Sequence, residues 1–246
     1  MAILDPIFNP LLKLDAVWVI AVISLIISLI VTIIYKFMTD QNLMKRLKDE
    51  MKALQNEMKE LKAHPEKMME VQKKAMQTNM QYMMQSMKST LVTFIPIIII
   101  FGWMNANIAY EPLLPGQEFT ASTNFAGETN GLISIDSFPE LEIQGNKTRS
   151  IDDGRVVWVL KGNAGDYTLE YDYNGEKYTQ EVLITNEQAY KPVSKIIKGS
   201  ELKSLQIGNK PKKVLDLGFW NMGWLGSYII FSLAFSMLLR KVFKLY

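Results

Sequence analysis

Three apolar blocks, each long enough to cross a lipid bilayer, constrain this chain more than any other feature of its sequence. They cover residues 16–38, 89–110 and 217–239. About 20 apolar residues in a helix are needed to cross a hydrocarbon core of about 30 Å. For the first block a cleavable signal peptide is the alternative, but Asp5 and Asp15 precede it in place of a basic start. We therefore expect an α-helical integral membrane protein with three transmembrane helices.

The distribution of basic residues predicts how these spans are oriented. Residues 36–88 contain 11 Lys or Arg and 7 Asp or Glu, whereas residues 111–216 contain 12 and 16. Since Lys and Arg accumulate on the cytoplasmic side, we expect residues 39–88 and the basic tail that closes segment 217–246 in the cytoplasm. The N-terminal segment 1–38 then begins outside the plasma membrane. Three lysines just before the third block oppose this assignment: Lys210, Lys212 and Lys213.

The charged segment 39–88 predicts an antiparallel coiled-coil hairpin. Apolar residues in its first arm alternate in steps of three and four, which is typical of a heptad seam. They are Met44, Leu47, Met51, Leu54, Met58 and Leu61. Pro65 ends this arm because it disfavours helix at His64. The second arm, residues 66–88, carries a stripe of methionines on one face. They are Met69, Met76, Met80, Met83, Met84 and Met87.

Two interpretations of the methionine stripe are open at this stage. The six side chains either pack against the seam of the first arm, or they form an exposed apolar surface that contacts substrates. Methionine is flexible and polarizable, so it suits the binding of apolar segments of varied sequence. The basic excess of the hairpin either contacts ribosomal RNA or anionic lipid through phosphates, or it is simply solvated.

Residues 111–190 predict a small extracytoplasmic β-sandwich, followed by a polar linker over 191–216. Runs such as RVVWVLKG alternate apolar and polar residues, and Asn174-Gly175 is a strong hairpin signal. The AGDYTLEY run resembles the tyrosine-corner strand of immunoglobulin-like sandwiches. Asn146, in Asn146-Lys147-Thr148, is a glycosylation candidate.

Polar side chains recur at steps of four in the first and third blocks, so each set lies roughly on one helix face. They are Ser24, Ser28, Thr32 and Lys36, and Tyr228, Ser232, Ser236 and Arg240. Ser and Thr can bond to carbonyls of their own helix, and Lys and Arg can reach the membrane surface. The alternative is a hydrophilic groove that opens to the cytoplasm, with Asn105 near its outer end.

The composition excludes several kinds of chemistry. There is no cysteine and only one histidine, which rules out disulfides and zinc sites built from Cys or clustered His. The phosphate-binding pattern Gly-x-x-x-x-Gly-Lys-Ser/Thr is absent. We therefore expect no enzyme activity, no catalytic residues, no metal and no cofactor.

The order of these elements, together with TFIPIIIIFGWMN in the second block, resembles the YidC/Oxa-type membrane-protein insertase superfamily. In particular it resembles the archaeal YidC-like branch, which is related to the third subunit of the ER membrane complex. The resemblance covers the three spans and the hairpin, but not the β domain. Bacterial relatives carry an arginine in the first core helix, where this chain has none and Lys36 is the nearest basic residue.

The resemblance implies an insertase or chaperone that accepts nascent membrane proteins through the hairpin and the groove, without nucleotide hydrolysis. Its implied partners are membrane lipids, nascent chains, the ribosome, and signal recognition or translocon machinery. A different class of function fits the same pattern. The chain would then be a structural tether or receptor, with the β domain bound to an envelope partner and the coiled coil to a cytoplasmic one. An accessory subunit of a transporter is a third interpretation.

Overall fold

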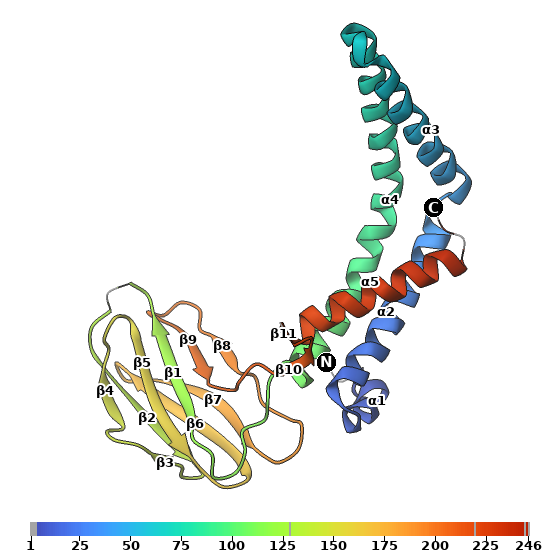
Figure 1. Cartoon of the computed structure of the whole chain (residues 1–246). Coiled ribbons are helices and arrows are strands. Elements are labelled where there is room, and N and C mark those ends of the chain that lie inside the picture. The colour runs from blue at the N-terminus through green and yellow to red at the C-terminus, as the bar shows by residue number, and fades with distance from the viewer. Residues whose placement is uncertain (1–3, 128, 219, 244, 246) are drawn as a thin grey trace. The chain divides into compact units, whose positions relative to one another are not determined.

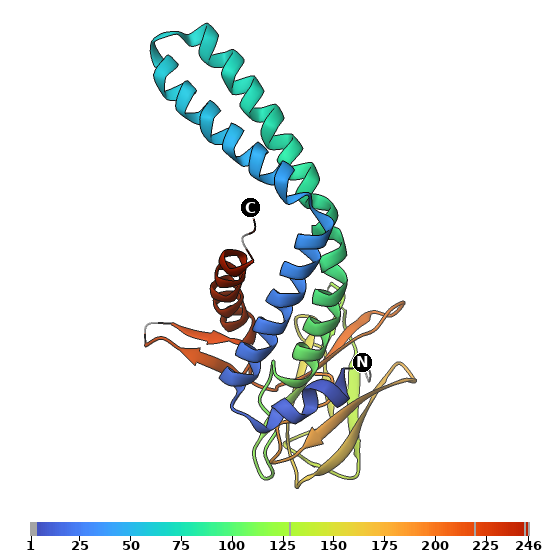
Figure 2. The same ribbon diagram turned by 90° about the vertical axis from the view of Figure 1, so that its right-hand side faces the viewer.

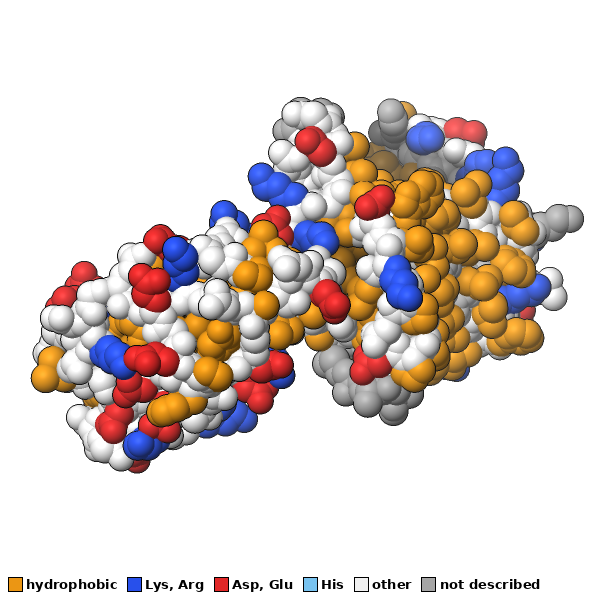
Figure 3. Space-filling view, turned by 90° about the horizontal axis from the view of Figure 1, so that it is seen from below, with side chains coloured by type: hydrophobic (Ala, Val, Ile, Leu, Met, Phe, Trp, Pro, Cys, Tyr) orange, Lys and Arg blue, Asp and Glu red, His pale blue; other side chains and the backbone are white. Residues whose placement is uncertain are grey.

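The computed structural model describes residues 4–127, 129–218, 220–243 and 245, and for Lys62 it describes the backbone only. The chain divides into two compact units, which Figure 1 shows as a helical part and a β part. We call Met1–Phe101 with Leu225–Tyr246 the helical unit, and Gly102–Trp224 the β unit. Hydrophobic side chains gather over the helices, whereas acidic and basic side chains are scattered over the β strands (Figure 3).

Three long helices are apolar enough to cross a membrane: α2 (Ala16–Met38), α4 (Pro65–Asn107) and α5 (Trp224–Val242). This confirms an integral membrane protein with three candidate spans. The other helical elements are α1 (Asp5–Phe8), η1 (Asn9–Lys13), α3 (Gln41–Glu60) and η2 (Leu61–Ala63). The α2 helix has the bounds of the first predicted block.

The third span begins later than the sequence predicts. Leu217 and Gly218 follow the first strand of a β hairpin whose second strand covers Asn221–Gly223, and α5 starts at Trp224 rather than Leu217. The Asp216 side chain accepts a hydrogen bond of 2.8 Å from the Gly218 N–H, and Gly218 has a φ of 80°. Glycine adopts this left-handed conformation at little cost, so the chain turns here although its composition is apolar.

The hairpin arm and the second span form one continuous helix. α4 has 43 residues, which correspond to about 64 Å at 1.5 Å per residue, and the predicted boundary between residues 88 and 89 is not a break. The α3 helix begins with a side-chain cap, because Asp40 accepts hydrogen bonds from the N–H groups of Asn42 and Leu43. Figures 1 and 2 both show α3 and the first part of α4 side by side, joined by the turn at η2.

The β unit contains two antiparallel sheets and a separate hairpin. The five-stranded sheet has the order β3 (Glu142–Ile143), β5 (Arg155–Lys161), β1 (Phe119–Phe125), β9 (Leu202–Ile207), β8 (Ser194–Ile196). The four-stranded sheet has the order β4 (Thr148–Ser150), β2 (Leu132–Phe138), β6 (Gly165–Tyr173), β7 (Glu176–Ile184). The hairpin consists of β10 (Lys213–Asp216) and β11 (Asn221–Gly223).

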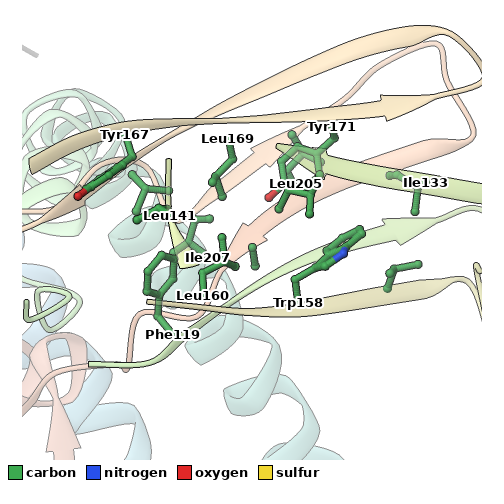
Figure 4. Packing of buried hydrophobic residues seen from close by; sticks show 14 of the residues in the cluster. Phe119, Ile133, Leu141, Trp158, Leu160, Tyr167, Leu169, Tyr171, Leu205 and Ile207 are labelled. Atoms are coloured by element: carbon green, nitrogen blue, oxygen red, sulfur yellow. The ribbon is translucent and has the colours of Figure 1, made fainter. Parts of the chain in front are cut away.

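Both sheets contribute to one hydrophobic core. Trp158 and Leu160 from β5 face Leu169 and Tyr171 from β6 across the interior, and all four are fully buried (Figure 4). The predicted hairpin at Asn174-Gly175 is confirmed, since Tyr173 pairs with Glu176 around this two-residue turn. Both turn residues have positive φ, as a type I′ turn requires.

The expected polar linker over residues 191–216 is wrong, because the structure places β8, β9 and β10 there. β9 pairs with β1 inside the five-stranded sheet, and its Leu202, Leu205 and Ile207 are buried in the core. Lys203 and Gln206, which alternate with these apolar residues, are exposed, and they hide the apolar pattern in the sequence.

The chain enters and leaves the β unit at adjacent points. The Glu111 N–H donates a hydrogen bond of 2.8 Å to the Lys210 carbonyl, and Tyr110 forms an isolated bridge with Pro211. The Asn209 side chain also donates to the Glu111 carbonyl at 2.9 Å. Backbone and side-chain hydrogen bonds thus join the first and last segments of the unit.

Candidate functional site

The polar stripe of α2 is buried within the helical unit. Ser24, Ser28 and Thr32 are each at most 5% exposed. The Thr32 hydroxyl donates a hydrogen bond of 2.6 Å to the Ser28 carbonyl of its own helix, and the Ser24 hydroxyl has no partner among the described residues. The stripe therefore lies on the face by which α2 packs against its neighbours.

The structure brings the α2 stripe together with the α5 stripe. The Ser28 hydroxyl donates to the Ser232 carbonyl at 3.4 Å, near the outer limit for a hydrogen bond. At the C-terminal ends of α2 and α5, the Arg240 guanidinium lies 5.3 Å from the centroid of the Tyr35 ring. The Lys36 ammonium lies 5.3 Å from the centroid of Phe243. The cation of α2 thus lies near an aromatic ring just after α5, and the cation of α5 lies near an aromatic ring of α2.

A cavity of about 300 Å³, lined mostly by side chains that carry a hydroxyl group, lies between α2, α4 and α5 at this end of the spans. Its lining consists of Val31, Tyr35, Tyr82, Ser86, Ser89, Thr90, Thr93 and Arg240. Six of these eight side chains carry a hydroxyl and one is charged, so the lining can bind polar groups beside three helices that are apolar enough to cross a membrane. Its volume is enough for several water molecules.

The α4 side of the cavity is a run of hydroxyl groups that donate to their own helix. Ser89 and Thr90 donate to the Ser86 carbonyl at 2.8 and 3.1 Å, and Thr93 donates to the Thr90 carbonyl at 2.7 Å. Each oxygen keeps an acceptor site for water or a bound group. Arg240 adds donors and the one formal charge among the lining residues.

Sequence reasoning missed this α4 run. Tyr82, Ser86, Ser89 and Thr93 follow in steps of four, three and four, which is the same signal that identified the stripes of the other spans. The signal was divided between the predicted hairpin and the predicted span, because the two were separated at residue 88. Treating 65–107 as one helix makes the face continuous.

The other predicted groove residues have different positions. Tyr228 packs edge to face on Phe101 with 4.7 Å between ring centroids, and Ser236 is half-buried. Asn105 belongs to the β unit, where its carbonyl accepts a hydrogen bond from Tyr190. Arg240 is, among the residues that the structure describes, the one predicted groove residue in the lining of this cavity.

The six methionines of α4 form an exposed surface. Each is between 54% and 68% exposed, so the interpretation that they pack against α3 is wrong. The side of α4 that carries Thr78 faces α3 instead, since the Thr78 hydroxyl donates to Glu50 at 3.3 Å and Thr78 is buried. On α3, the seam residues Met44, Leu47 and Leu54 are buried. We call the six exposed residues the methionine surface.

The exposed apolar residues of α4 continue from this surface into the membrane-spanning part of the helix. Leu91, Phe94 and Ile98 follow Met87 at steps of three and four, and all are more than half exposed. No helix break separates the two parts. One apolar stripe therefore extends along α4 from the charged hairpin into the apolar span.

Within the part of the chain that the structure describes, no group of three or more His, Asp or Glu is placed to hold a metal ion. Asn146 of the β unit is exposed in the turn before β4. The cavity and the methionine surface are therefore the features of the helical unit on which a function can be argued.

Comparison with known proteins finds a family match for the first half of the chain, which includes most of the helical unit. The model of the family described as integral membrane protein EMC3/TMCO1-like matches residues 2–124, which is half of the sequence. The matched range contains α2, α3 and α4, and it ends within β1. No curated protein and no solved structure matched the chain.

Proposed function

Since this chain belongs to the EMC3/TMCO1-like family of integral membrane proteins, within the Oxa1/YidC/Alb3 insertase-related superfamily, we propose that it inserts nascent membrane proteins into the bilayer. The observation that carries this proposal is the hydroxyl-lined cavity with Arg240 at one end of three apolar helices. In this proposal the chain performs no chemical catalysis and hydrolyses no nucleotide. The apolar span of the substrate supplies the driving force.

The cavity would lower the barrier for the polar flank of a substrate. A charged side chain at the bilayer centre costs at least about 2.5–3.5 kcal/mol on insertion scales. Hydroxyl groups and water in the cavity replace part of the lost hydration, over the part of the path near the cavity. Arg240 would attract acidic groups in the flank, and it would supply the charge that bacterial relatives place on the first core helix.

The methionine surface would receive the apolar segment of the substrate. Unbranched, polarizable side chains adapt to segments of different shape, and the six residues are exposed. The apolar stripe through Leu91 and Ile98 offers a continuous path from this surface toward the bilayer. Binding and release would both be rapid, because the six methionine side chains lie exposed on the helix surface.

Several finer assignments form part of this proposal. Residues 39–88 form a coiled coil in the cytoplasm, the N-terminus and the β unit lie outside the plasma membrane, and the chain is of the archaeal YidC-like type. The ribosome, or the signal recognition or translocon machinery, would deliver substrates to the hairpin. The basic excess of residues 36–88 supports this orientation.

We also propose that the β unit is an immunoglobulin-like sandwich. The Tyr167 hydroxyl donates a hydrogen bond of 3.0 Å to the Asn163 carbonyl four residues upstream, as the tyrosine corner of such domains does. Trp158 is fully buried between the two sheets. The alternative function, a tether or receptor, is favoured by the fact that this unit has a hydrophobic core of its own.

Site-specific photocrosslinking on stalled ribosomes separates the two functions. A photoreactive residue is placed at Thr90 in the cavity or at Met84 on the methionine surface, and at Leu25, which is exposed on α2, as the lipid-facing control. Insertion predicts that nascent membrane proteins crosslink to positions 90 and 84 more than to position 25. Equal crosslinking at all three positions would leave the tether as the better interpretation.

A further inference from the structure

The β10–β11 hairpin presents an exposed apolar tip immediately before the third span. Asp216 pairs with Asn221 at the end of the two strands. In the loop between them, Leu217 is 42% exposed and Trp220 is 61% exposed. The Leu217 N–H donates to the Trp220 carbonyl at 3.2 Å, so the turn that carries both side chains is hydrogen bonded. Exposing these apolar side chains to water is unfavourable.

Chain connectivity keeps this tip close to the membrane. Trp220 precedes Trp224, the first residue of α5, by four positions, and four residues of extended chain cover at most about 14 Å. The headgroup region adds roughly 5–8 Å to each side of the hydrocarbon core. The tip is therefore within reach of the leaflet that α5 enters at its N-terminal end.

We propose that the tip of the β10–β11 hairpin inserts into the phospholipid headgroup region and acts as an interfacial anchor. Trp suits this position because its ring combines an apolar body with one polar N–H. Asp216 limits the depth, since its carboxylate accepts the Gly218 N–H at the base of the turn and a charge is costly in hydrocarbon. The anchor would then hold Trp220 and Leu217 at the level of the headgroups.

The α5 helix is short for a membrane span, and an anchor at its N-terminal end would compensate for this. Sixteen residues, Trp224 to Leu239, precede Arg240 in this helix, and they cover about 24 Å, less than the hydrocarbon core of about 30 Å. A short span is accommodated by local thinning or by flanking residues at the interface, at modest cost. The hairpin tip at one end and Arg240 with Lys241 at the other would fix the position of α5 along the membrane normal, and with it the depth of Arg240.

Spin labelling tests the anchor in the full-length protein, because the chain has no native cysteine. Leu217→Cys is labelled with a nitroxide and reconstituted into phosphatidylcholine vesicles. Two matched labels are Ser194→Cys on the exposed strand β8 and Leu233→Cys on the exposed face of α5. We expect position 217 to lose collisions with a water-soluble nickel chelate relative to position 194, and to gain collisions with oxygen. Equal chelate collisions at 217 and 194 would overturn the proposal.

A second measurement does not depend on a label. In vesicles of brominated phosphatidylcholine, the Trp220→Phe variant is compared with the unmodified chain. We expect the share of tryptophan fluorescence that bromine quenches to fall in the variant, while Trp158, buried in the β core, remains unquenched in both. A quenched share that stays the same or rises means that Trp220 is quenched no more than the average tryptophan of the chain, which also overturns the anchor. Neither result depends on insertion activity, so the anchor and the proposed function can fail separately.

Discussion

The hydroxyl of Tyr190 donates a hydrogen bond of 2.7 Å to the carbonyl of Asn105, near the C-terminal end of α4. The hydroxyl oxygen of Tyr190 also accepts a hydrogen bond of 2.8 Å from the Ala109 N–H. The Gln188 side chain donates to the Tyr110 carbonyl at 3.0 Å. The last carbonyls of a helix have no partner within it. Residues 188–190 therefore cap the C-terminal end of α4, and all of these groups belong to the β unit.

Tyr190→Phe is expected to destabilise the β unit by about 1–3 kcal/mol, because the Ala109 N–H and the Asn105 carbonyl both lose their partner. Thermal unfolding of the full-length protein in detergent, followed by circular dichroism of the β unit's strands, measures the change. Tyr178→Phe is a matched control, since Tyr178 is half-buried and bonds side chains only. Equal melting temperatures for Tyr190→Phe and the native chain would contradict a capping role.

The same tyrosine predicts a dependence on alkaline pH. Burial raises the pKa of Tyr190 to about 12, above about 10 in an unfolded chain. Its contribution to the free energy of unfolding is therefore complete below pH 10, and it is lost as the pH rises from about 10 to 12. Between pH 10 and 12, the free energy of unfolding should decline less for Tyr190→Phe than for the native chain. Parallel declines would mean that Tyr190 does not contribute.

Arg240→Gln is expected to reduce insertion of substrates with acidic flanks by roughly tenfold, which corresponds to the loss of about 1–2 kcal/mol of attraction in a partly screened site. Arg240→Lys should retain part of the activity, although an ammonium cannot stack on Tyr35 as a guanidinium does. Protease protection of substrates in proteoliposomes measures insertion.

Lys241→Gln is the matched control for this experiment, because it removes the neighbouring charge without changing the cavity lining. An equal loss for Arg240→Gln and Lys241→Gln would assign the effect to the net charge at the end of α5. The cavity would then have no special role.

Replacing Met80, Met84 and Met87 together by Ser should weaken crosslinking to nascent chains and leave stability nearly unchanged, since exposed positions usually contribute within about 0.5 kcal/mol each. Leu at the same positions should preserve much of the binding. Met44→Ala is the contrasting control: Met44 is fully buried on α3, and such truncations cost about 2–5 kcal/mol. Unchanged crosslinking in the Ser variant would contradict a substrate-binding surface.

Asn146 tests the proposed orientation. Translation in the presence of endoplasmic-reticulum microsomes should attach one glycan to the chain, because Asn146 is exposed and the β unit is proposed to face the lumen in that system. Thr148→Ala removes the acceptor motif and should abolish the shift in electrophoretic mobility. A chain that stays unglycosylated while a control acceptor at the N-terminus is modified would contradict an outer β unit.

The long elements of the helical unit were predictable because hydrophobic length and period are strong signals. The bounds of α2 follow from a run of apolar residues alone. The start of α5 did not follow, because Leu217 and Trp220 are apolar residues in a β hairpin, and only the Asp216–Gly218 turn distinguishes them. In the β unit, Asn174-Gly175 gave a hairpin, whereas β9 was missed because its core residues are separated by lysine and polar residues.

The candidate site was predicted in part. Periodicity indicated that Ser28 and Ser232 each belong to a polar stripe on one helix face. It does not indicate which helix each of these faces contacts. The contact between α2 and α5 depends on tertiary packing, and so does the α4 side of the cavity. The exposure of the methionines also depended on which face of α4 meets α3, and Thr78 rather than a methionine occupies that face.

The hydrogen bond between Glu111 and Lys210 has a consequence for the history of the chain. A domain whose two ends lie one hydrogen bond apart can be added to a short loop, or removed from it, without demanding a new path for the segments on either side. The family model ends at residue 124, just after the chain has entered this domain. The β unit thus has the geometry of a graft, and homologues that carry a different domain or a plain loop between the second and third spans would need no change in their helices.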